Sequence, residues 1–386
     1  MARVVKAVDT QTSAAALIDT ARRVTIKVGS SLLVEPSERR VRRQWLVSLG
    51  DDIAALRARG KQVVVVSSGA VALGRVHLGL KKSARLDHKQ AAAAAGQALL
   101  MQAWEEALSR HHIPTAQLLL TIEDTERRRR WLNARATLEV LLAQQALPVI
   151  NENDSVATDE LRYGDNDRLS ARAAQMIKSD LLILLSDVDG VYTADPARDP
   201  DARHVPFIDE ISAEIEASAG GSAAAGVGTG GMRTKIAAAK VASGFGCATI
   251  IASGHAAHPV RRLEEGAQAT VVAAKGSPGN AYKQWIAASL APAGSVAIDA
   301  GAARALGAGK SLLPAGVVSV SGRFERGACL SVLDEQGREV ARGIAAYNSH
   351  EAQAILGCTS EHIAGRLGYE GPPELIHRDD MVMVQS

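Results

Sequence analysis

Residues 24–33 read VTIKVGSSLL, and this stretch decides the fold. Its first five residues are apolar or β-branched apart from Lys27, so a strand formed here would be apolar on both faces. Strands of this kind are typical of parallel sheets that helices cover on both sides. Four further segments have the same character: KQVVVVSS (61–68), LPVIN (147–151), DLLILLSD (180–187) and ATIIAS (248–253). Together these segments predict one parallel sheet.

Longer amphipathic stretches separate the predicted strands. They span residues 44–59, 87–110, 126–145 and 166–178, and their apolar residues recur at helical spacing. The alternation of strands and helices predicts an α/β fold, a three-layer, doubly wound and mainly parallel sheet, over residues 22–275.

The rest of the chain divides into three parts. Residues 1–21 precede the first strand, and we expect them to be a disordered N-terminal extension. Residues 276–292 combine Gly, Pro and polar residues with one short helical pattern, so we expect a linker. Residues 293–386 carry short apolar segments separated by Gly and Pro, which predicts a small β-rich domain.

The composition excludes several classes of protein. Of the 386 residues, 47% are hydrophobic and 22% are charged, as in ordinary globular chains. No apolar stretch is long enough for a transmembrane helix, and the N-terminus, which contains Asp9 and Asp19, lacks the apolar core of a secretory signal. Three scattered cysteines without a CxxC pattern argue against a disulfide framework and against a zinc site. We therefore expect a cytoplasmic protein without a membrane partner.

The charge is unevenly distributed along the chain. Residues 293–386 hold eight Lys or Arg against 11 Asp or Glu, a net charge of −3. Since the whole chain has a net charge of +2, residues 1–292 have a net charge of +5. A mildly basic first part suits an anionic ligand. Because phosphate neutralisation by Lys and Arg supplies most nucleic-acid affinity, the acidic C-terminal part makes nucleic acid an unfavourable partner.

Two segments match nucleotide-binding motifs incompletely. Residues 309–311, GKS, end like a P-loop, but the pattern requires glycine where the chain has Arg304. Residues 226–231 contain GxGxxG, but no strand precedes them and no acid follows at the required spacing. The second segment still leads into a helical pattern with Lys235 in its first turn, so glycine backbone and a helix N-terminus could meet a phosphate there. The alternative explanation is a plain Gly/Ala linker.

Small polar or acidic residues follow each predicted strand. In an open α/β sheet, ligands collect at the carboxyl ends of the strands. Lys27 lies inside an apolar strand, a costly position for a charge unless an anion meets it. The candidates at these strand ends are Lys27, Ser68, Asn151, Asp154, Ser186 and Asp187.

Residues 165–167 read Asp-Asn-Asp at the start of a predicted helix. The simple explanation is N-capping, for which Asn and Asp are well suited. One capping residue is sufficient, so three in a row favour a functional role for Asn166 and Asp167.

The order of the motifs resembles that of one family. The chain contains VTIKVGSSLL, VVVVSSGAVALG, PVINENDSVAT, YGDNDRLSA, LLSDVDGVYTADP and GTGGMRTKIAAAKVA in this order. On these motifs it resembles the glutamate 5-kinases, a group of amino-acid kinases, over nearly all of its length after residue 22. The C-terminal part, with SLLPAGVVSVSGRFERG and HRDDM, resembles a PUA domain. The resemblance implies the amino-acid-kinase fold for residues 22–275 and a PUA-like fold for residues 293–386.

The resemblance also implies roles for particular residues. Lys27 would bridge the nucleotide phosphates and the transferred group, Lys235 would stabilise the leaving side, and Asp167 would hold both ammonium groups. The residues implied to bind glutamate are Ser68, Asp154, Asn166 and Asn151. Those implied to bind ATP are Lys27, Ser186, Asp187, Thr229, Gly230, Gly231, Met232, Arg233, Thr234 and Lys235.

The implied reaction transfers the γ-phosphoryl group of ATP to the γ-carboxylate of L-glutamate, the first step of proline biosynthesis. A carboxylate with a pKa of ~4.3 is already ionised at pH 7, so the reaction requires no general base. The resemblance further implies Mg²⁺ on the nucleotide without assigning a protein ligand. It implies a homo-oligomer, a dimer or tetramer, and proline as a feedback inhibitor.

Two alternatives stay open. The first is another amino-acid kinase, acting on aspartate, acetylglutamate or a nucleoside monophosphate, because a sequence does not measure the length of a pocket. The second is an RNA-binding protein that uses the PUA-like part. The intact Lys27, Asp167 and Lys235 and the acidic C-terminal part argue against it.

Overall fold

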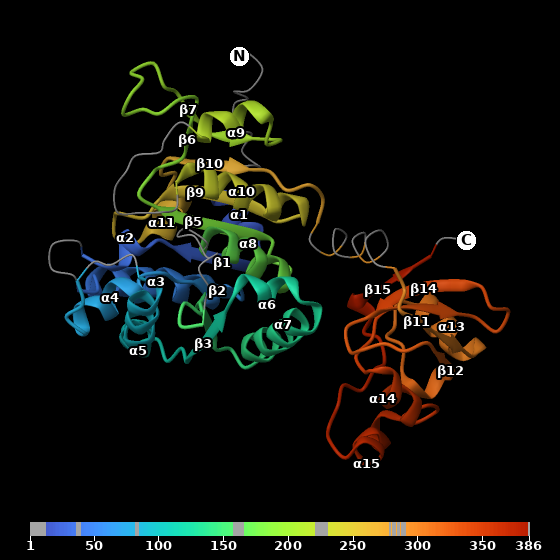
Figure 1. Ribbon diagram of the computed structural model, residues 1–386. Coiled ribbons are helices and arrows are strands. Elements are labelled where there is room, and N and C mark those ends of the chain that lie inside the picture. The colour runs from blue at the N-terminus through green and yellow to red at the C-terminus, as the bar shows by residue number, and fades with distance from the viewer. Residues whose placement is uncertain are drawn as a thin grey trace. The chain divides into compact units, whose positions relative to one another are not determined.

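The computed structural model describes residues 13–35, 40–81, 85–156, 166–220, 231–277 and 291–384, together with the single residues 279, 283 and 286. The chain divides into two compact units, one of residues 1–127 and 133–278 and the other of residues 128–132 and 279–386 (Figure 1). Because most of the predicted linker lies outside the described residues, its limits at 276 and 292 stay a prediction.

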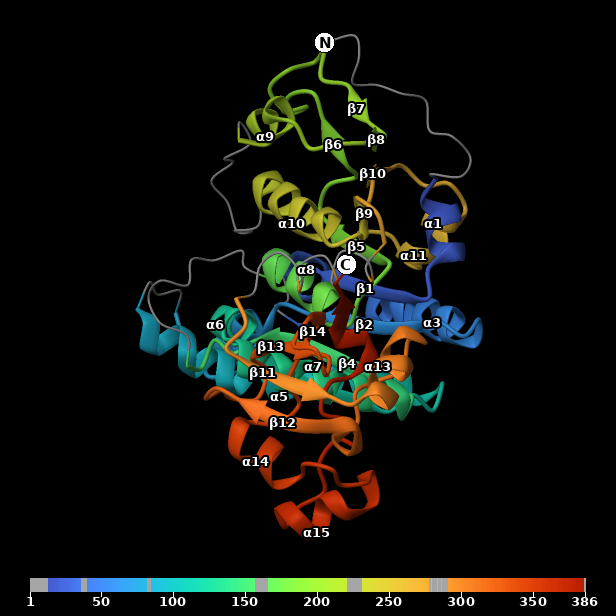
Figure 2. The same ribbon diagram turned by 90° about the vertical axis from the view of Figure 1, so that its right-hand side faces the viewer.

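An eight-stranded sheet forms the centre of the first unit. Its strands are β3 Thr115–Leu120, β4 Leu147–Glu152, β2 Gln62–Val66, β1 Arg23–Val28, β5 Leu181–Ser186, β9 Ala248–Ser253, β10 Ala269–Val272 and β8 Phe207–Ile208, given in their order across the sheet. Neighbours from β3 to β9 are parallel, whereas β10 is antiparallel to β9 and parallel to β8. Figure 2 shows β10, β9, β5, β1 and β2 in this order from top to bottom. The predicted mainly parallel sheet is confirmed.

Helices connect these strands. The first unit contains α1 Ala14–Thr20, α2 Ser30–Leu33, α3 Arg43–Ala58, α4 Ala70–His77, α5 Leu86–Ser109, α6 Ile122–Glu126, α8 Asn166–Met176, α9 Ala213–Gly220, α10 Met232–Gly244 and α11 Pro259–Glu264, with a small hairpin of β6 Val191–Tyr192 and β7 His204–Val205. Helix α7 Arg128–Ala143 belongs to this unit from residue 133 onward, and its first five residues belong to the second unit. The four predicted helices are confirmed as α3, α5, α7 and α8. Within the described part of the chain, no helix combines the length and the apolar character needed to cross a bilayer.

The central strands are apolar on both sides because each side packs against helices. Along β5, Leu182 and Leu184 lie in a core cluster with residues of α8 and α10. Leu181 and Ile183 lie in a second cluster with residues of α1, α3 and α5. Successive side chains of a strand point to opposite faces of the sheet. This alternation produces the three layers that the sequence predicts.

The N-terminal residues contribute to this core, so the prediction of a disordered extension is wrong for residues 13–21. Ser13 caps α1 by accepting the backbone N–H of Ala16, and Ile18 is fully buried in the main cluster. Lys61 Nζ donates to the carbonyl oxygens of Asp19 and Ala21 at 2.6 Å and 2.8 Å, which satisfies groups at the C-terminal end of the helix. Because α1 has only seven residues, its apolar face was too short to predict a helix from the sequence. Residues 1–12 lie outside the described part of the chain.

Two glycines bring α4 and α5 together backbone to backbone. A Cβ atom on Gly74 would lie 1.7 Å from the carbonyl oxygen of Ala92, and one on Gly96 would lie 1.8 Å from that of Ala70. Side chains at either position would force the helices apart. Gly69, which precedes α4, has a φ of +105° that favours glycine. The turn from β2 into α4 is therefore closely specified, and this turn carries the predicted site residue Ser68.

The second unit contains a five-stranded mixed sheet. Its strands, in order, are β12 Val317–Ser321, β11 Gly294–Ile298, β13 Cys329–Leu333, β14 Glu339–Ile344 and β15 Met381–Met383. Three short helices, α13 Ala300–Gly307, α14 Ser349–Ala354 and α15 Ile363–Leu367, accompany the sheet. The predicted β-rich fold is confirmed, although the helices were not predicted. The GKS segment at 309–311 follows α13 and opens no helix, which excludes a P-loop.

Candidate active site

A buried carboxylate connects two lysines from different elements. Asp167, in the first turn of α8, has 0% exposure. Its Oδ1 lies 2.6 Å from Lys27 Nζ on β1, and its Oδ2 lies 3.5 Å from Lys235 Nζ in the first turn of α10. Thr234 Oγ1 donates to Asp167 Oδ2 at 2.7 Å. The structure thus brings together the three residues that the sequence predicts to act as one catalytic group.

The three charges depend on one another. Burial opposes ionisation of Asp167, but the ammonium groups of Lys27 and Lys235 hold the pKa of Asp167 below its usual value. Burial lowers the pKa of Lys235, and Asp167 counteracts that effect. Two ammonium groups against one carboxylate leave a surplus positive charge with little solvent around it, since Lys27 and Lys235 are 7% and 3% exposed. Such a surplus suits an anionic ligand.

A cluster of amide and hydroxyl groups lies at the ends of β2 and β4. Asn166 Nδ2 donates to Ser68 Oγ at 2.6 Å, to the carbonyl oxygen of Ser67 at 3.1 Å and to Asn151 Oδ1 at 3.1 Å. The other amide atom, Asn166 Oδ1, is buried and accepts no hydrogen bond from any described residue. A buried acceptor of this kind is available to a hydrogen-bond donor from a ligand or an ordered water molecule. Ser68, Asn151 and Asn166, predicted as a group, are therefore in contact.

Asp154 lies two residues beyond β4 and is partly buried. Its burial raises the pKa of the carboxyl group to about 6. A carboxylate in such a position gains from a cationic partner, because an opposite charge favours the ionised form.

The nucleotide side of the predicted site begins at the end of β5. Ser186 is 3% exposed, and its Oγ donates to Asp187 Oδ1 at 2.8 Å. Asp187 itself is exposed. The two residues therefore place a hydroxyl group and a carboxylate group at the carboxyl end of the strand.

The glycine-rich segment at residues 226–231 leads into α10, and the structure describes it only from Gly231 onward. Gly231 is the N-cap of α10, and Met232, Arg233, Thr234 and Lys235 form its first turn. Backbone N–H groups at a helix N-terminus attract anions. Thr229 and Gly230 lie outside the described residues, so their predicted contacts with ATP stay a prediction.

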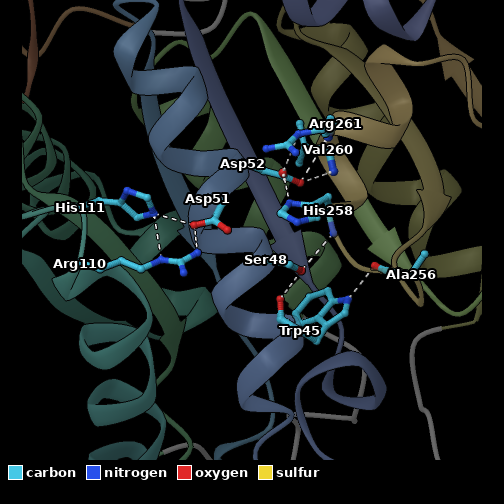
Figure 3. A network of polar contacts seen from close by, with 10 residues as sticks. All are labelled: Trp45, Ser48, Asp51, Asp52, Arg110, His111, Ala256, His258, Val260 and Arg261. Atoms are coloured by element: carbon cyan, nitrogen blue, oxygen red, sulfur yellow. Dashed lines mark hydrogen bonds and ion pairs between the residues drawn. The ribbon is translucent and has the colours of Figure 1, made fainter.

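A polar network on α3 holds the loop that follows β9 (Figure 3). Asp52, which is 2% exposed, lies 3.0 Å from His258 Nδ1 through Oδ1 and accepts the backbone N–H of Val260 at 2.9 Å through Oδ2. Ser48 Oγ accepts the backbone N–H of His258 at 3.0 Å. Burial raises the pKa of Asp52, and its hydrogen bonds counteract this effect in part. This network fixes His258, whose φ of +53° is unusual for a residue with a side chain.

The same loop touches the nucleotide side. Trp45 Nε1 donates to the carbonyl oxygens of Gly254 and Ala256 at 2.6 Å and 3.1 Å. The backbone N–H of Gly254 donates to the carbonyl oxygen of Ser186 at 2.8 Å. These contacts could not be predicted from the sequence, because they join separate segments of the chain, about two hundred positions apart in the case of Trp45.

Trp104 is a second supporting residue that the sequence did not reveal. Its indole Nε1 donates to Ser67 Oγ at 3.0 Å, and the side chain is fully buried on α5. The signal available was one tryptophan among four in a chain with 3% aromatic residues, and such a residue also reads as ordinary core.

Comparison with known families agrees with this architecture. Residues 22–253 match the amino acid kinase family, and residues 294–367 match the PUA domain. The chain belongs to the amino acid kinase family.

Curated relatives confirm the resemblance to the glutamate 5-kinases. The glutamate 5-kinase of Caulobacter vibrioides is 58% identical over 95% of this chain and 97% of its own length. The enzyme of the same name from Paramagnetospirillum magneticum is 54% identical over 94% of this chain and 98% of its own. Among solved structures, the carbamate kinase from Giardia lamblia bound to AMP-PNP has a TM-score of 0.48 at 16% identity, over 67% of this chain and 100% of its own.

Proposed function

We propose that this chain transfers the γ-phosphoryl group of ATP to the γ-carboxylate of L-glutamate, the first step of proline biosynthesis. The observation that carries the proposal is the buried Lys27–Asp167–Lys235 group. Its carboxylate, Asp167, lies in the same turn of α8 as Asn166, whose amide joins the cluster at the ends of β2 and β4. Relatives that are 58% identical over 95% of the chain carry the name of this activity.

The chemistry requires positive charge more than it requires a base. The acceptor carboxylate and the triphosphate are both anionic, and the carboxylate is already ionised at pH 7. Phosphoryl transfer is accelerated mainly by positioning and by cations around the transferred group. Lys27 neutralises the transferred group and Lys235 the leaving side, while Asp167 keeps both ammonium groups in place.

Glutamate would bind on the other side of this group. Ser68, Asn151 and Asn166 offer hydroxyl and amide groups, and Asn166 Oδ1 would accept a hydrogen bond from the ammonium group of the substrate. Asp154 would pair with the same ammonium group. That pairing would lower the pKa of Asp154 again, because the cation favours the carboxylate form.

ATP would bind along Ser186, Asp187 and the segment from Thr229 to Lys235. Mg²⁺ would arrive on the phosphates, where it neutralises their charge. Among the described residues there is no group of three His, Cys, Asp or Glu side chains placed to hold a metal ion. This suits an ion that keeps most of its ligands as waters and phosphate oxygens. Asp187 is exposed just after β5, and its carboxylate would be the protein ligand of Mg²⁺ beside these waters and phosphate oxygens.

The proposal extends to partners and location. Proline resembles a cyclised glutamate, so it would act as a feedback inhibitor in the pocket formed by Ser68, Asn166 and Asp154. The enzyme would work in the cytoplasm as a homo-oligomer, a dimer or tetramer. The balance of −3 in residues 293–386 makes RNA binding by the PUA domain an unfavourable alternative.

A comparison of acceptor substrates tests the proposal. ATP turnover should be supported by L-glutamate and much less by aspartate or acetylglutamate. The Ser68→Ala variant should raise the KM for glutamate more than the KM for ATP, and it should weaken inhibition by proline. A preference for aspartate or acetylglutamate would favour another amino-acid kinase. RNA binding without turnover of any of the three acids would favour the RNA-binding alternative.

A further inference from the structure

Hydrogen bonds connect the turn that follows β5, residues 187–190, to the start of β10, the strand that runs antiparallel to β9. Asp187 is exposed, but Asp189 turns back toward Gln268, which immediately precedes β10. Gln268 Nε2 donates to Asp189 Oδ2 at 2.8 Å and to Tyr192 OH at 3.0 Å. Tyr192 OH donates to the Asp189 carboxylate at 3.2 Å. Three side chains thus connect the turn to the start of β10.

Thr270 makes a second connection deeper in the structure. It lies within β10 and has 0% exposure. Its Oγ1 accepts the backbone N–H of Val191 at 2.7 Å and donates to the carbonyl oxygen of Val205 at 2.6 Å. A single hydroxyl group therefore joins β6 and β7 to β10, the strand next to the edge of the sheet.

The fit around this hydroxyl group is close. A Cβ atom on Gly190 would lie 2.4 Å from His204 Nε2 and 2.6 Å from Thr270 Oγ1. The ring of His204 packs edge-on against Tyr192, with centroids 5.3 Å apart. Burial lowers the pKa of His204, and its Nε2 lies 3.4 Å from Thr270 Oγ1. The backbone of residues 187–190 therefore has little freedom to move away from β10.

We propose that Thr270 and Gln268 are positioning residues of the nucleotide site: through Val191 and Asp189 they hold the turn at Ser186 and Asp187 in the conformation that receives ATP. This inference rests on the proposed function, in which that turn contacts the nucleotide. Neither residue touches the Lys27–Asp167–Lys235 group through any described contact. Their loss should therefore affect the affinity for ATP and leave glutamate binding unchanged.

The test compares three variants of the full chain. Thr270→Val keeps the shape of the side chain and removes the hydroxyl contacts with Val191, Val205 and His204, and we expect the KM for ATP to rise on the order of tenfold. Thr270→Ser keeps the hydroxyl group and should retain the wild-type KM for ATP. The matched control is Thr249→Val on the neighbouring strand β9. Thr249 is equally buried at 0% exposure, but its Oγ1 has no hydrogen-bond partner among the described residues.

Gln268→Ala provides an independent variant at the surface end of the turn, where a failure to fold is not expected. It should raise the KM for ATP several-fold, with the KM for glutamate unchanged. Equilibrium binding of AMP-PNP without glutamate should weaken in parallel in both variants. Equal increases of both KM values, or a lower Tm with no change in the KM for ATP, would overturn the inference. If the wild-type chain does not phosphorylate glutamate, the proposed function fails, but weaker AMP-PNP binding by the two variants would still support the positioning role.

Discussion

Replacing Asp167 with asparagine would remove the one negative charge that two buried ammonium groups share. Asp167 has 0% exposure, and its oxygens lie 2.6 Å from Lys27 Nζ and 3.5 Å from Lys235 Nζ. The amide has nearly the same shape and can still accept a hydrogen bond from Thr234. The variant therefore changes charge far more than packing. Removing one partner of a buried ion pair costs about 3–5 kcal/mol, because the remaining charges are left uncompensated.

Stability and turnover should both fall in this variant. A loss of about 3 kcal/mol corresponds to a decrease in Tm of about 10 °C for a domain of this size. The kcat should fall by about 100-fold or more, since Lys27 and Lys235 lose the group that positions them against the phosphates. Thermal unfolding gives the first quantity. Steady-state kinetics, measured well below the Tm of the variant, gives the second.

Asp52→Asn is the matched control for this prediction. Asp52 is also buried, at 2% exposure, and it accepts backbone hydrogen bonds, but it has no contact with the two lysines among the described residues. The amide can serve most of the same partners, so this variant should lose some stability and keep its turnover. If Asp167→Asn retains a kcat within threefold of the wild type, the assigned role of the carboxylate is wrong.

Three further predictions concern pH, packing and domain structure. Because burial raises the pKa of Asp154 to about 6, the free protein loses stability as the pH rises from about 4 to about 6, and the loss is complete above that range; Asp154→Asn should raise the Tm at pH 8 and lose that advantage by about pH 4, while its KM for glutamate rises. Gly74→Ala would place a methyl group 1.7 Å from a backbone oxygen and should destabilise the protein by about 3 kcal/mol or more, whereas Gly244→Ala, where nothing lies within 4 Å, should be tolerated in urea unfolding. A fragment of residues 1–278 should phosphorylate glutamate, because all the proposed catalytic residues precede residue 236; a folded but inactive fragment would show that the C-terminal part is needed for activity or assembly.

The strands that could be predicted from the sequence are those buried on both faces of the sheet. Strands β1, β2, β4, β5 and β9 are covered on both faces, and their continuous apolar runs are distinctive. Strand β3 was missed because Gln117 is exposed and Thr115 and Ala116 are only partly buried, which breaks the apolar run. The short strands β10 and β8 are the last two strands of the sheet, and their few residues give no periodic signal. The helix α1 was missed because only one of its faces meets the core.

The candidate site shows the same division. Lys27, Ser68, Asn151 and Ser186 could be predicted because parallel strands present their carboxyl ends at one edge of a sheet. Supporting contacts could not be predicted in this way, because they join distant segments. The bond from Gln268 to Asp189 and the bond from Trp104 to Ser67 depend on the folded arrangement alone.

The most direct test of the account is to identify the acyl phosphate formed from glutamate. Incubating the full chain with ATP, Mg²⁺, L-glutamate and hydroxylamine should trap the product as a hydroxamate, and mass spectrometry can assign the carboxyl group that carries it. The account predicts γ-glutamyl hydroxamate in proportion to ADP formed, and none from the Lys27→Ala variant. Hydroxamate on the α-carboxyl group, or ADP formed without any hydroxamate, would contradict it.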